Sequence, residues 1–267
     1  MSEARSLAGG KLRLDHPAEG VARLVVANAA KRNALDFAIL GGIADALPQL
    51  DARCVLITGE GPVFSAGYDI GSLPRDEFAR AAEELVAHPF HAALEAVEAH
   101  PYPVVAALNG HAIGGGLELA LSCDLVVAAE SAQVGMPPAK LGLIYSHTGL
   151  RKFIDAVGVT RTRELFHVGR NIDARRALEW GLVNEVVADG ELADRGLALA
   201  AEVAANAPLS LSGNKRVIRA LLAAEGELDP EVERELIELR QSCFASDDFS
   251  EGVRAFAEKR RPRWTGR

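Results

Sequence analysis

In the first half of the chain, the apolar residues fall into short runs separated by turns that contain glycine or proline. Residues 11–15 and 21–27 flank the turn "HPAEG" and predict two strands joined by that turn. Asp36 then suits the N-cap of a helix whose apolar residues recur at helical spacing. Further buried strands are predicted within "RCVLITGE", "PYPVVAALNG" and "CDLVVAA".

The second half has mostly helical periodicity. Residues 75–99 already predict a helix that is interrupted at Pro89, and one late strand is predicted in "LVNEVVA". The other predicted helices cover residues 149–157, 160–167, 173–180, 191–205, 208–224, 230–245 and 248–259. The pattern therefore predicts an α/β core over residues 1–190 and a helical C-terminal region over 191–267.

Composition narrows the class of protein. The net charge of −8 disfavours a nucleic-acid partner, which would require a basic face. The cysteines are widely spaced, which predicts reduced thiols and no metal site. No apolar run approaches the ~20 residues that cross a bilayer, and the first residues lack the apolar core of a signal peptide. We expect a cytoplasmic protein that does not bind membranes.

Three consecutive glycines, Gly114 to Gly116, precede a predicted helix that contains Glu118 in its first turn. A helix N-terminus presents unpaired N–H groups, and glycine lets a ligand approach them closely. The turn "SAGYD" at 65–69 could supply a second N–H, and two such donors form an oxyanion hole. Two tight packing turns are the alternative interpretation. The glycine pattern lacks the acidic residue or lysine of nucleotide-binding motifs.

Motifs in a fixed order give a more specific indication. They are "KRNALD" (31–36), "FSAGYDI" (64–70), "NGHAIGGGLELALSCDL" (109–125), residues 156–187 and "SDDFSEGVRAFAEKRRPRW" (246–264). Together they resemble the crotonase superfamily, the enoyl-CoA hydratase/isomerase family, over nearly the whole chain. The resemblance implies a spiral of ββα units with a C-terminal helical trimerisation region. It also implies homotrimers or dimers of trimers, and a coenzyme A thioester as substrate with no separate cofactor.

The same resemblance implies roles for individual residues. The backbone amides of Ala66 and Gly115 would hold the thioester oxygen, and the adenine would lie along the 66–69 loop. Lys31 and Arg32 would meet the phosphates, and Phe256 and Lys259 would reach the ligand of a neighbouring subunit. Other residues expected at the substrate are Ala34, Tyr68, Asp69, Ile70, Gly114 and Pro138. Asp69 is more plausibly a loop-fixing residue, and Tyr68 a wall of the acyl pocket.

The identity of the proton-transfer groups separates the possible reactions. Hydratases that resemble this chain at Glu118 carry a second carboxylate at the position of Pro138, and two acids normally share the proton transfers. Tyr145 instead resembles the tyrosine of the methylmalonyl-CoA decarboxylase branch, although that branch tends to carry histidine at the position of Tyr68. We expect decarboxylation of a small branched malonyl-CoA, in which Tyr145 orients the substrate carboxylate.

Two alternatives to decarboxylation stay open at this point. The first is 2-enoyl-CoA hydration with Glu118 as the only carboxylate. The second is a non-catalytic acyl-CoA-binding protein, which the proline at position 138 would explain. Histidines 88, 91, 111 and 147 suit proton transfer near neutral pH, but each is more plausibly a surface or packing residue.

Overall fold

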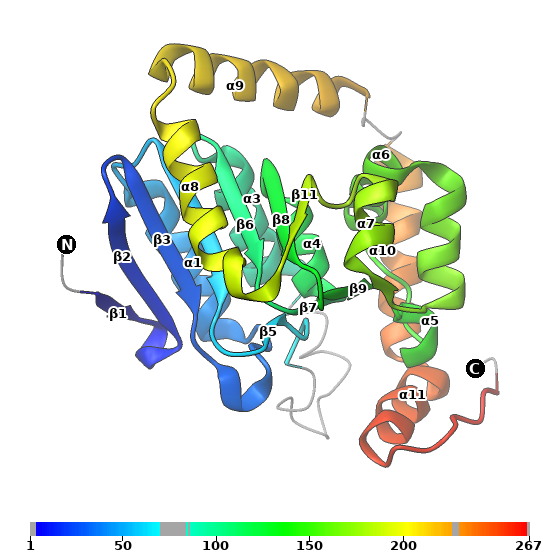
Figure 1. Ribbon diagram of the computed structural model, residues 1–267. Coiled ribbons are helices and arrows are strands. Elements are labelled where there is room, and N and C mark those ends of the chain that lie inside the picture. Colours follow the sequence, from blue (N-terminus) through cyan, green and yellow to red (C-terminus); the bar gives the residue numbers. More distant parts are fainter. Residues whose placement is uncertain (1–3, 70–83, 85, 226–229, 266–267) are drawn as a thin grey trace.

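The computed structural model describes residues 4–69, 84, 86–225 and 230–265, and within these ranges the larger of two sheets has seven strands. Its order is β1-β2-β3-β4-β6-β8-β11 (Figure 1). β3, β4, β6, β8 and β11 run parallel, and β1 and β2 add an antiparallel edge. The strands are Arg5–Leu7, Leu12–Ala18, Val21–Val26, Cys54–Gly59, Val104–Leu108, Leu125–Ala129 and Glu185–Val187.

A second sheet of four short strands crosses the end of the first, in the order β10-β9-β7-β5. The strands are β5 (Val63–Ser65), β7 (His111–Ile113), β9 (Gln133–Gly135) and β10 (Ile172–Asp173). None of them was predicted as a separate strand, because two or three residues are too few to show an alternating pattern. β5 and β7 lead directly into the two glycine-containing turns.

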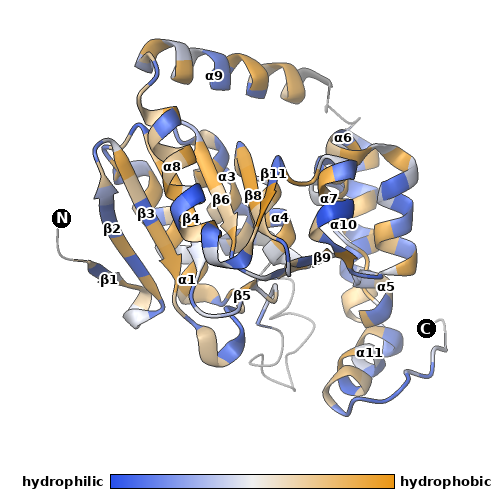
Figure 2. Ribbon diagram, in the orientation of Figure 1, coloured by the Kyte–Doolittle hydropathy of each residue, from blue (hydrophilic) through white to orange (hydrophobic). Residues whose placement is uncertain are grey.

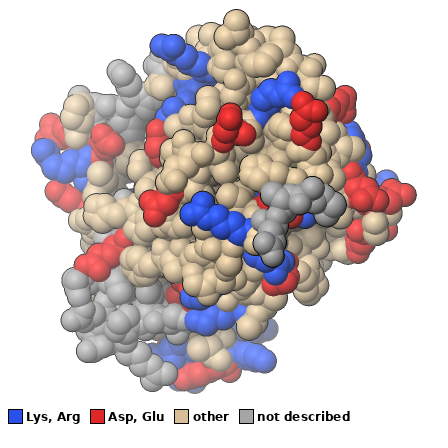
Figure 3. Space-filling view, turned by 90° about the vertical axis from the view of Figure 1, so that its left-hand side faces the viewer, with Lys and Arg blue, Asp and Glu red and all other residues tan. Residues whose placement is uncertain are grey.

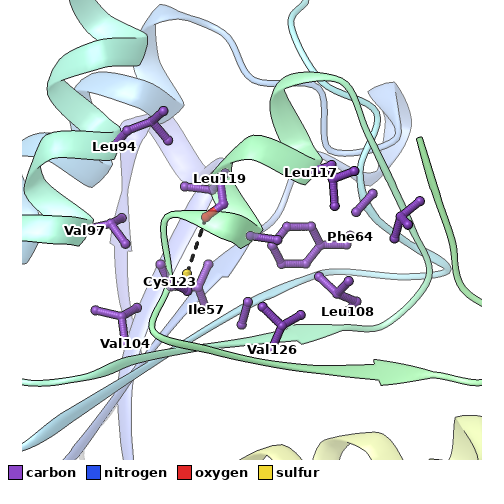
Figure 4. Close-up of a cluster of buried hydrophobic side chains, with 14 of the residues drawn as sticks. Ile57, Phe64, Leu94, Val97, Val104, Leu108, Leu117, Leu119, Cys123 and Val126 are labelled. Atoms are coloured by element: carbon purple, nitrogen blue, oxygen red, sulfur yellow. Dashed lines mark hydrogen bonds between the residues drawn. The ribbon is translucent and has the colours of Figure 1, made fainter. Parts of the chain in front are cut away.

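Helices cover both faces of the large sheet. α1 (Phe37–Ala46) and α3 (His91–Ala99) lie on one face and α8 (Leu192–Ala204) lies on the other. Figure 2 shows the central strands as the most apolar part of the ribbon, as expected for parallel strands buried on both sides. In Figure 4 the Phe64 ring lies among apolar side chains that include Leu117, below α4 (Gly115–Leu121), and the Cys123 thiol donates to the Leu119 carbonyl.

The C-terminal helices form two separate parts. α9 (Pro208–Glu225) extends over the top of the molecule in Figure 1, and α10 (Pro230–Phe244) and α11 (Asp247–Ala257) pack beside α5 (Pro138–Leu141) and α6 (His147–Arg163). α7 (Ala174–Trp180) lies between β10 and β11 in the chain. Shorter helical turns are Ala8–Gly10, Ala29–Lys31, Leu47–Gln49, Val86–Phe90, Glu164–Val168 and Asp189–Glu191.

The predicted α/β architecture is confirmed, with two local differences. Helices predicted at 149–157 and 160–167 form α6 and the turn after it, and Gly158 (φ 75°, ψ 165°) breaks α6 at the predicted gap. α8, assigned by sequence to the helical C-terminal region, packs its small side chains on the sheet. The face shown in Figure 3 carries interspersed acidic and basic side chains separated by uncharged surface.

Candidate active site

Two turns meet at one edge of the small sheet. β5 and β7 are parallel and paired (Val63 with His111, Ser65 with Ala112), so the segments that follow them emerge side by side. Gly67 (φ +90°) lies against the second turn, and a β-carbon there would be 2.7 Å from the Ile113 carbonyl oxygen. The same β-carbon would be 3.2 Å from the Gly115 nitrogen, so only glycine fits this contact. The predicted proximity of the two turns is therefore present.

The hydrogen bonds of the first turn decide which of its amides can meet a ligand. The Ala66 N–H donates to the Arg32 carbonyl (3.0 Å), and the Gly67 N–H donates to the Ser65 hydroxyl (3.2 Å). The amides of Tyr68 and Gly115 have no acceptor among the described residues. The assignment of Ala66 as an oxyanion donor is therefore corrected, because its N–H is already used, and Tyr68 is the available donor in that turn.

A segment distant in sequence holds the first turn. Arg32 and Asn33 both have left-handed backbones (φ 54° and 55°), an unusual pair for residues other than glycine. The buried Asn33 amide donates to the Val63 carbonyl (2.6 Å) and the Glu60 carbonyl (2.9 Å), and the Ser65 hydroxyl donates to the Asn33 carbonyl (2.8 Å). Sequence reasoning missed Asn33, since nothing in "KRNALD" distinguishes a buried asparagine from an ordinary loop residue.

Glu118 and Tyr145 form a buried pair next to these turns. Glu118, in the first turn of α4, is 2% exposed, and the Tyr145 hydroxyl donates to its Oε2 at 2.5 Å. The Tyr68 and Tyr145 hydroxyl oxygens are 3.4 Å apart. A β-carbon at Gly149 would lie 2.9 Å from Glu118 Oε1, so this glycine leaves room for the carboxylate. The sequence predicted both members of the pair, but the Tyr145 proton is directed at Glu118.

Burial dominates the electrostatics of the pair. It raises the pKa of Glu118, against the lowering effects of the nearby Lys152 ammonium and of the Tyr145 hydrogen bond. Burial and the Glu118 charge raise the pKa of Tyr145 well above its usual value, so this phenol keeps its proton. Lys152 itself is held by Glu98 (2.5 Å) and by the Ser122 hydroxyl (2.8 Å).

Glu118 also forms part of the wall of a cavity of about 580 Å³. Apolar walls come from Phe90, Leu94 and Ile237. The polar lining comes from the turn at 86–90, from α3, from the start of α6 and from α10, and includes Arg240, which is only 9% exposed. Arg240 was not singled out in the sequence, because α10 reads there as a charge-rich exposed helix.

The residues expected at the phosphates lie near the first turn. The Lys31 ammonium forms an ion pair with the buried Asp69 carboxylate at 2.7 Å, consistent with a loop-fixing role for Asp69. Arg32 is exposed and Ala34 is buried beside it. Ile70 lies outside the described residues.

The remaining predicted residues are spread over three places. Gly114 (φ 56°) caps α4 and donates its N–H to the Gly135 carbonyl (2.9 Å). Pro138 is buried at the start of α5. Phe256 (74% exposed) and Lys259 lie at the end of α11, outside the cavity wall, so their expected contact with a neighbouring subunit stays a prediction.

Among the described residues, no three histidine, cysteine or carboxylate side chains are grouped so that they could hold a metal ion. No helix in the same part of the chain is long and apolar enough to cross a membrane.

Comparison with known proteins gives consistent matches over most of the chain. The family model for enoyl-CoA hydratase/isomerase matches residues 17–267. A probable enoyl-CoA hydratase of Bacillus subtilis is 35% identical over 244 residues, which are 88% of this chain and 91% of the relative. A carnitinyl-CoA dehydratase of Salmonella enteritidis is 35% identical over 248 residues, 89% of this chain and 92% of the relative.

Solved structures agree with the sequence matches. An enoyl-CoA hydratase/isomerase from Pseudoalteromonas atlantica superposes with a TM-score of 0.83 at 32% identity, over 96% of this chain and all of the other. A methylmalonyl-CoA decarboxylase complexed with 2S-carboxypropyl-CoA gives a TM-score of 0.87 at 28% identity, over 96% and 98% of the two chains. The expected crotonase fold is thus confirmed.

Proposed function

Because the chain belongs to the enoyl-CoA hydratase/isomerase family, we propose that it is an acyl-CoA lyase that forms a thioester enolate. The amides of Tyr68 and Gly115 bind the thioester oxygen, and preorganised donors of this kind favour the charge that develops there. The observation that carries this proposal is a pair of amides without acceptors among the described residues, on two touching turns beside the buried Glu118. Coenzyme A enters as part of the substrate, and its phosphates meet Lys31 and Arg32.

The reaction that we favour is decarboxylation of a small branched malonyl-CoA. The bond between the α-carbon and the carboxylate breaks, CO₂ leaves, and the electron pair remains as the enolate held by the two amides. No base is needed for this step. The Glu118–Tyr145 pair then supplies a proton to the α-carbon, which suits a carboxyl group whose pKa is raised. Support comes from Pro138, which replaces the second acid of hydratases, and from the likeness to methylmalonyl-CoA decarboxylase.

Hydration of a 2-enoyl-CoA is the second candidate, and the sequence relatives favour it. Both curated relatives at 35% identity are named for hydration or dehydration of a CoA thioester. In this reaction Glu118 works in its ionised form and takes a proton from water, while Tyr145 fixes the carboxylate. A single acid must then serve both proton transfers.

A direct test offers methylmalonyl-CoA and crotonyl-CoA to the enzyme and follows CO₂ release and the loss of enoyl absorbance. The expected result is CO₂ release that is faster than hydration. In decarboxylation, protonated Glu118 is the donor to the enolate, so the rate should decline, without being abolished, as pH rises through the raised pKa. Hydration requires ionised Glu118, so its rate should fall as pH decreases through the same pKa.

Two variants separate the roles within the pair. Glu118→Gln should abolish hydration and leave part of the decarboxylation, and Tyr145→Phe should lower either rate about 10²-fold or more. Tyr102→Phe is the matched control, because Tyr102 does not line the cavity. Unchanged activity in Tyr145→Phe would contradict its role, and the absence of any turnover together with acyl-CoA binding would point to a binding protein.

We further propose a cytoplasmic homo-oligomer, a trimer or a dimer of trimers. α9 presents a row of exposed apolar side chains, which normally indicates a protein contact: Leu209, Val217, Ile218, Leu221 and Leu222. Light scattering after size exclusion would measure the mass, and a monomer at micromolar concentration would exclude this proposal.

A further inference from the structure

The carboxylate of Glu118 needs a counter-charge in either of the proposed reactions. Glu118 gives up or takes up a proton during turnover, so it passes through an ionised form although it is only 2% exposed. Burying an ionised carboxylate is costly unless an opposite charge lies nearby. The Tyr145 hydroxyl, which donates to Glu118 Oε2 at 2.5 Å, supplies a hydrogen bond but no charge. The wall of the same cavity also contains the ammonium group of Lys152.

Lys152 is carried by the helix that already packs on the Glu118 carboxylate. Gly149 of α6 lies so close that a β-carbon there would be 2.9 Å from Glu118 Oε1. Lys152 is three residues further along α6, and residues at this spacing lie on the same face of a helix. This face of α6 therefore makes room for the carboxylate at Gly149 and places a positive charge one turn further on.

Two polar side chains hold the Lys152 ammonium. It donates to the Ser122 hydroxyl at 2.8 Å, and that hydroxyl donates to the Glu118 carbonyl at 3.1 Å. Ser122 is the buried C-cap of α4, so these two bonds connect Lys152 to the helix that carries Glu118. Glu98 of α3 forms an ion pair with the same ammonium at 2.5 Å. Lys152, whose side chain is 25% exposed, is thus fixed between α3 and α4.

The cavity wall contains further titratable or charged side chains, from the segment before α3, from α3, from the start of α6 and from α10: Glu84, His88, His91, Glu95, His147 and Arg240. The phenols of Tyr68 and Tyr145 also lie beside Glu118, and burial raises the pKa of both well above the usual value. Burial has the largest effect on Glu118 and raises its pKa, whereas the Lys152 charge lowers it and the Glu98 charge raises it.

We propose that Lys152 is a positioning residue for the proton transfers: it is the counter-charge of Glu118, and Glu98 and Ser122 hold it in place. Lys152 favours the ionised form of Glu118 and Glu98 favours the neutral form, so their ion pair sets how readily Glu118 exchanges its proton. With Pro138 in the place of a second acid, one carboxyl group has to serve in both forms. The inference rests on the proposed function only in assigning the proton transfers to Glu118.

Infrared titration of the protein without substrate tests the inference independently of turnover. The difference spectrum between a chain and its Glu118→Gln counterpart contains the carboxyl band of Glu118, whose intensity falls as the group ionises. Lys152→Met should move the midpoint of this titration to higher pH, and Glu98→Gln should move it to lower pH. A merely structural loss of the ion pair would move the midpoint in the same direction in both variants.

Lys152→Arg keeps the charge and should leave the midpoint close to that of the wild type. Arg151→Met is the matched control on the same helix and should not move it, because Arg151 pairs with Asp155 and does not line the cavity. An unchanged midpoint in Lys152→Met, or shifts in the same direction in Lys152→Met and Glu98→Gln, would overturn the inference. If Lys152→Met does not fold, Glu98→Gln decides alone, and a midpoint that is not lowered there would overturn it.

The pH profile of turnover should follow the infrared midpoint. Below the wild-type midpoint, hydration of crotonyl-CoA should be about tenfold slower in Lys152→Met than in Glu98→Gln, because less Glu118 is ionised. Turnover of neither methylmalonyl-CoA nor crotonyl-CoA by the wild type would refute the proposed function, and the infrared shifts would still decide the inference about Lys152.

Discussion

The two turns that flank the proposed thioester site are held in different ways. The first, at 65–69, is fixed by hydrogen bonds to a segment more than thirty residues earlier in the chain. The second, at 114–116, is held mainly by close packing against the first, with one backbone hydrogen bond from the Gly114 N–H to the Gly135 carbonyl. A β-carbon on Gly116 would lie 2.6 Å from the Ser65 carbonyl oxygen, and one on Gly115 would lie 2.8 Å from the Tyr68 ring.

The two amides are therefore positioned by different kinds of contact. Polar contacts set the direction of the Tyr68 amide, and the lack of side chains sets the approach of the Gly115 amide. The polar contacts of the first turn and the close packing of the second come together where Ser65 faces Gly116. Substitutions can therefore disturb them separately or together.

The largest effect is expected from adding a methyl group to the second turn. The β-carbon added by Gly116→Ala would overlap backbone and side-chain atoms of Ser65. The amides of Tyr68 and Gly115 should therefore move, and turnover should fall about 10²–10³-fold. Overpacking should also cost about 1–3 kcal/mol of the free energy of unfolding. Enzyme kinetics and urea denaturation measure the two effects. Gly41→Ala in α1 is the control, because nothing lies within 4 Å of its β-carbon, and equal activities of the two variants would refute the packing argument.

A smaller effect is expected from the polar support of the first turn. Asn33→Ala leaves the Val63 and Glu60 carbonyls without this donor, which should cost about 2–3 kcal/mol of stability and lower turnover about tenfold. Asn33→Gly keeps the left-handed backbone and separates strain from lost hydrogen bonds. Asn214→Ala, on exposed α9, should change neither quantity. Loss of stability with full activity would show that the turn keeps its shape without Asn33.

Removing a single hydroxyl should have a weaker effect. Ser65→Ala removes the hydrogen bond to the Asn33 carbonyl and the one from the Gly67 N–H. This change should lower the free energy of unfolding by about 1 kcal/mol and reduce turnover a few-fold. Denaturant titration beside steady-state kinetics would measure both, with the exposed Ser212→Ala as the control. Activity below that of Gly116→Ala would reverse the proposed ranking of the two turns.

The smallest expected quantity is the coupling between the turns. Ser65→Gly removes the side-chain atoms that meet an added methyl group at position 116, but the Ser65 carbonyl contact remains. In a double-mutant cycle, Ser65→Gly should therefore recover about 0.5–1 kcal/mol of the loss in Gly116→Ala. Strict additivity of the two unfolding free energies would show that the turns are held independently.

The sequence predicted those parts of the fold and of the site that have a local pattern of composition or periodicity. The long strands, most of the helices and the glycine turn beside Glu118 were predicted because each has a local pattern. The short strands of the second sheet have no such pattern, and their pairing depends on contacts between distant segments.

The backbone amide that serves as donor in the first turn could not be identified from the local sequence. "SAGYD" contains several amides. Those of Ala66, Gly67 and Asp69 donate to the Arg32 carbonyl, the Ser65 hydroxyl and the Leu35 carbonyl, and these three bonds leave the Tyr68 amide as the available donor. Asn33 and Arg240 were missed for a related reason, since burial of a polar side chain is decided by the helices or strands that later pack over it.

The contribution of α10 to the cavity wall has a consequence for how the protein is made. A ribosome completes both turns, Glu118 and Tyr145 long before it reaches Pro230, where α10 begins. A chain interrupted in between would contain both turns and the Glu118–Tyr145 pair, but the cavity beside Glu118 would lack the part of its wall that comes from Ile237 and Arg240 on α10. The wall of this cavity is therefore completed only in the last stage of translation.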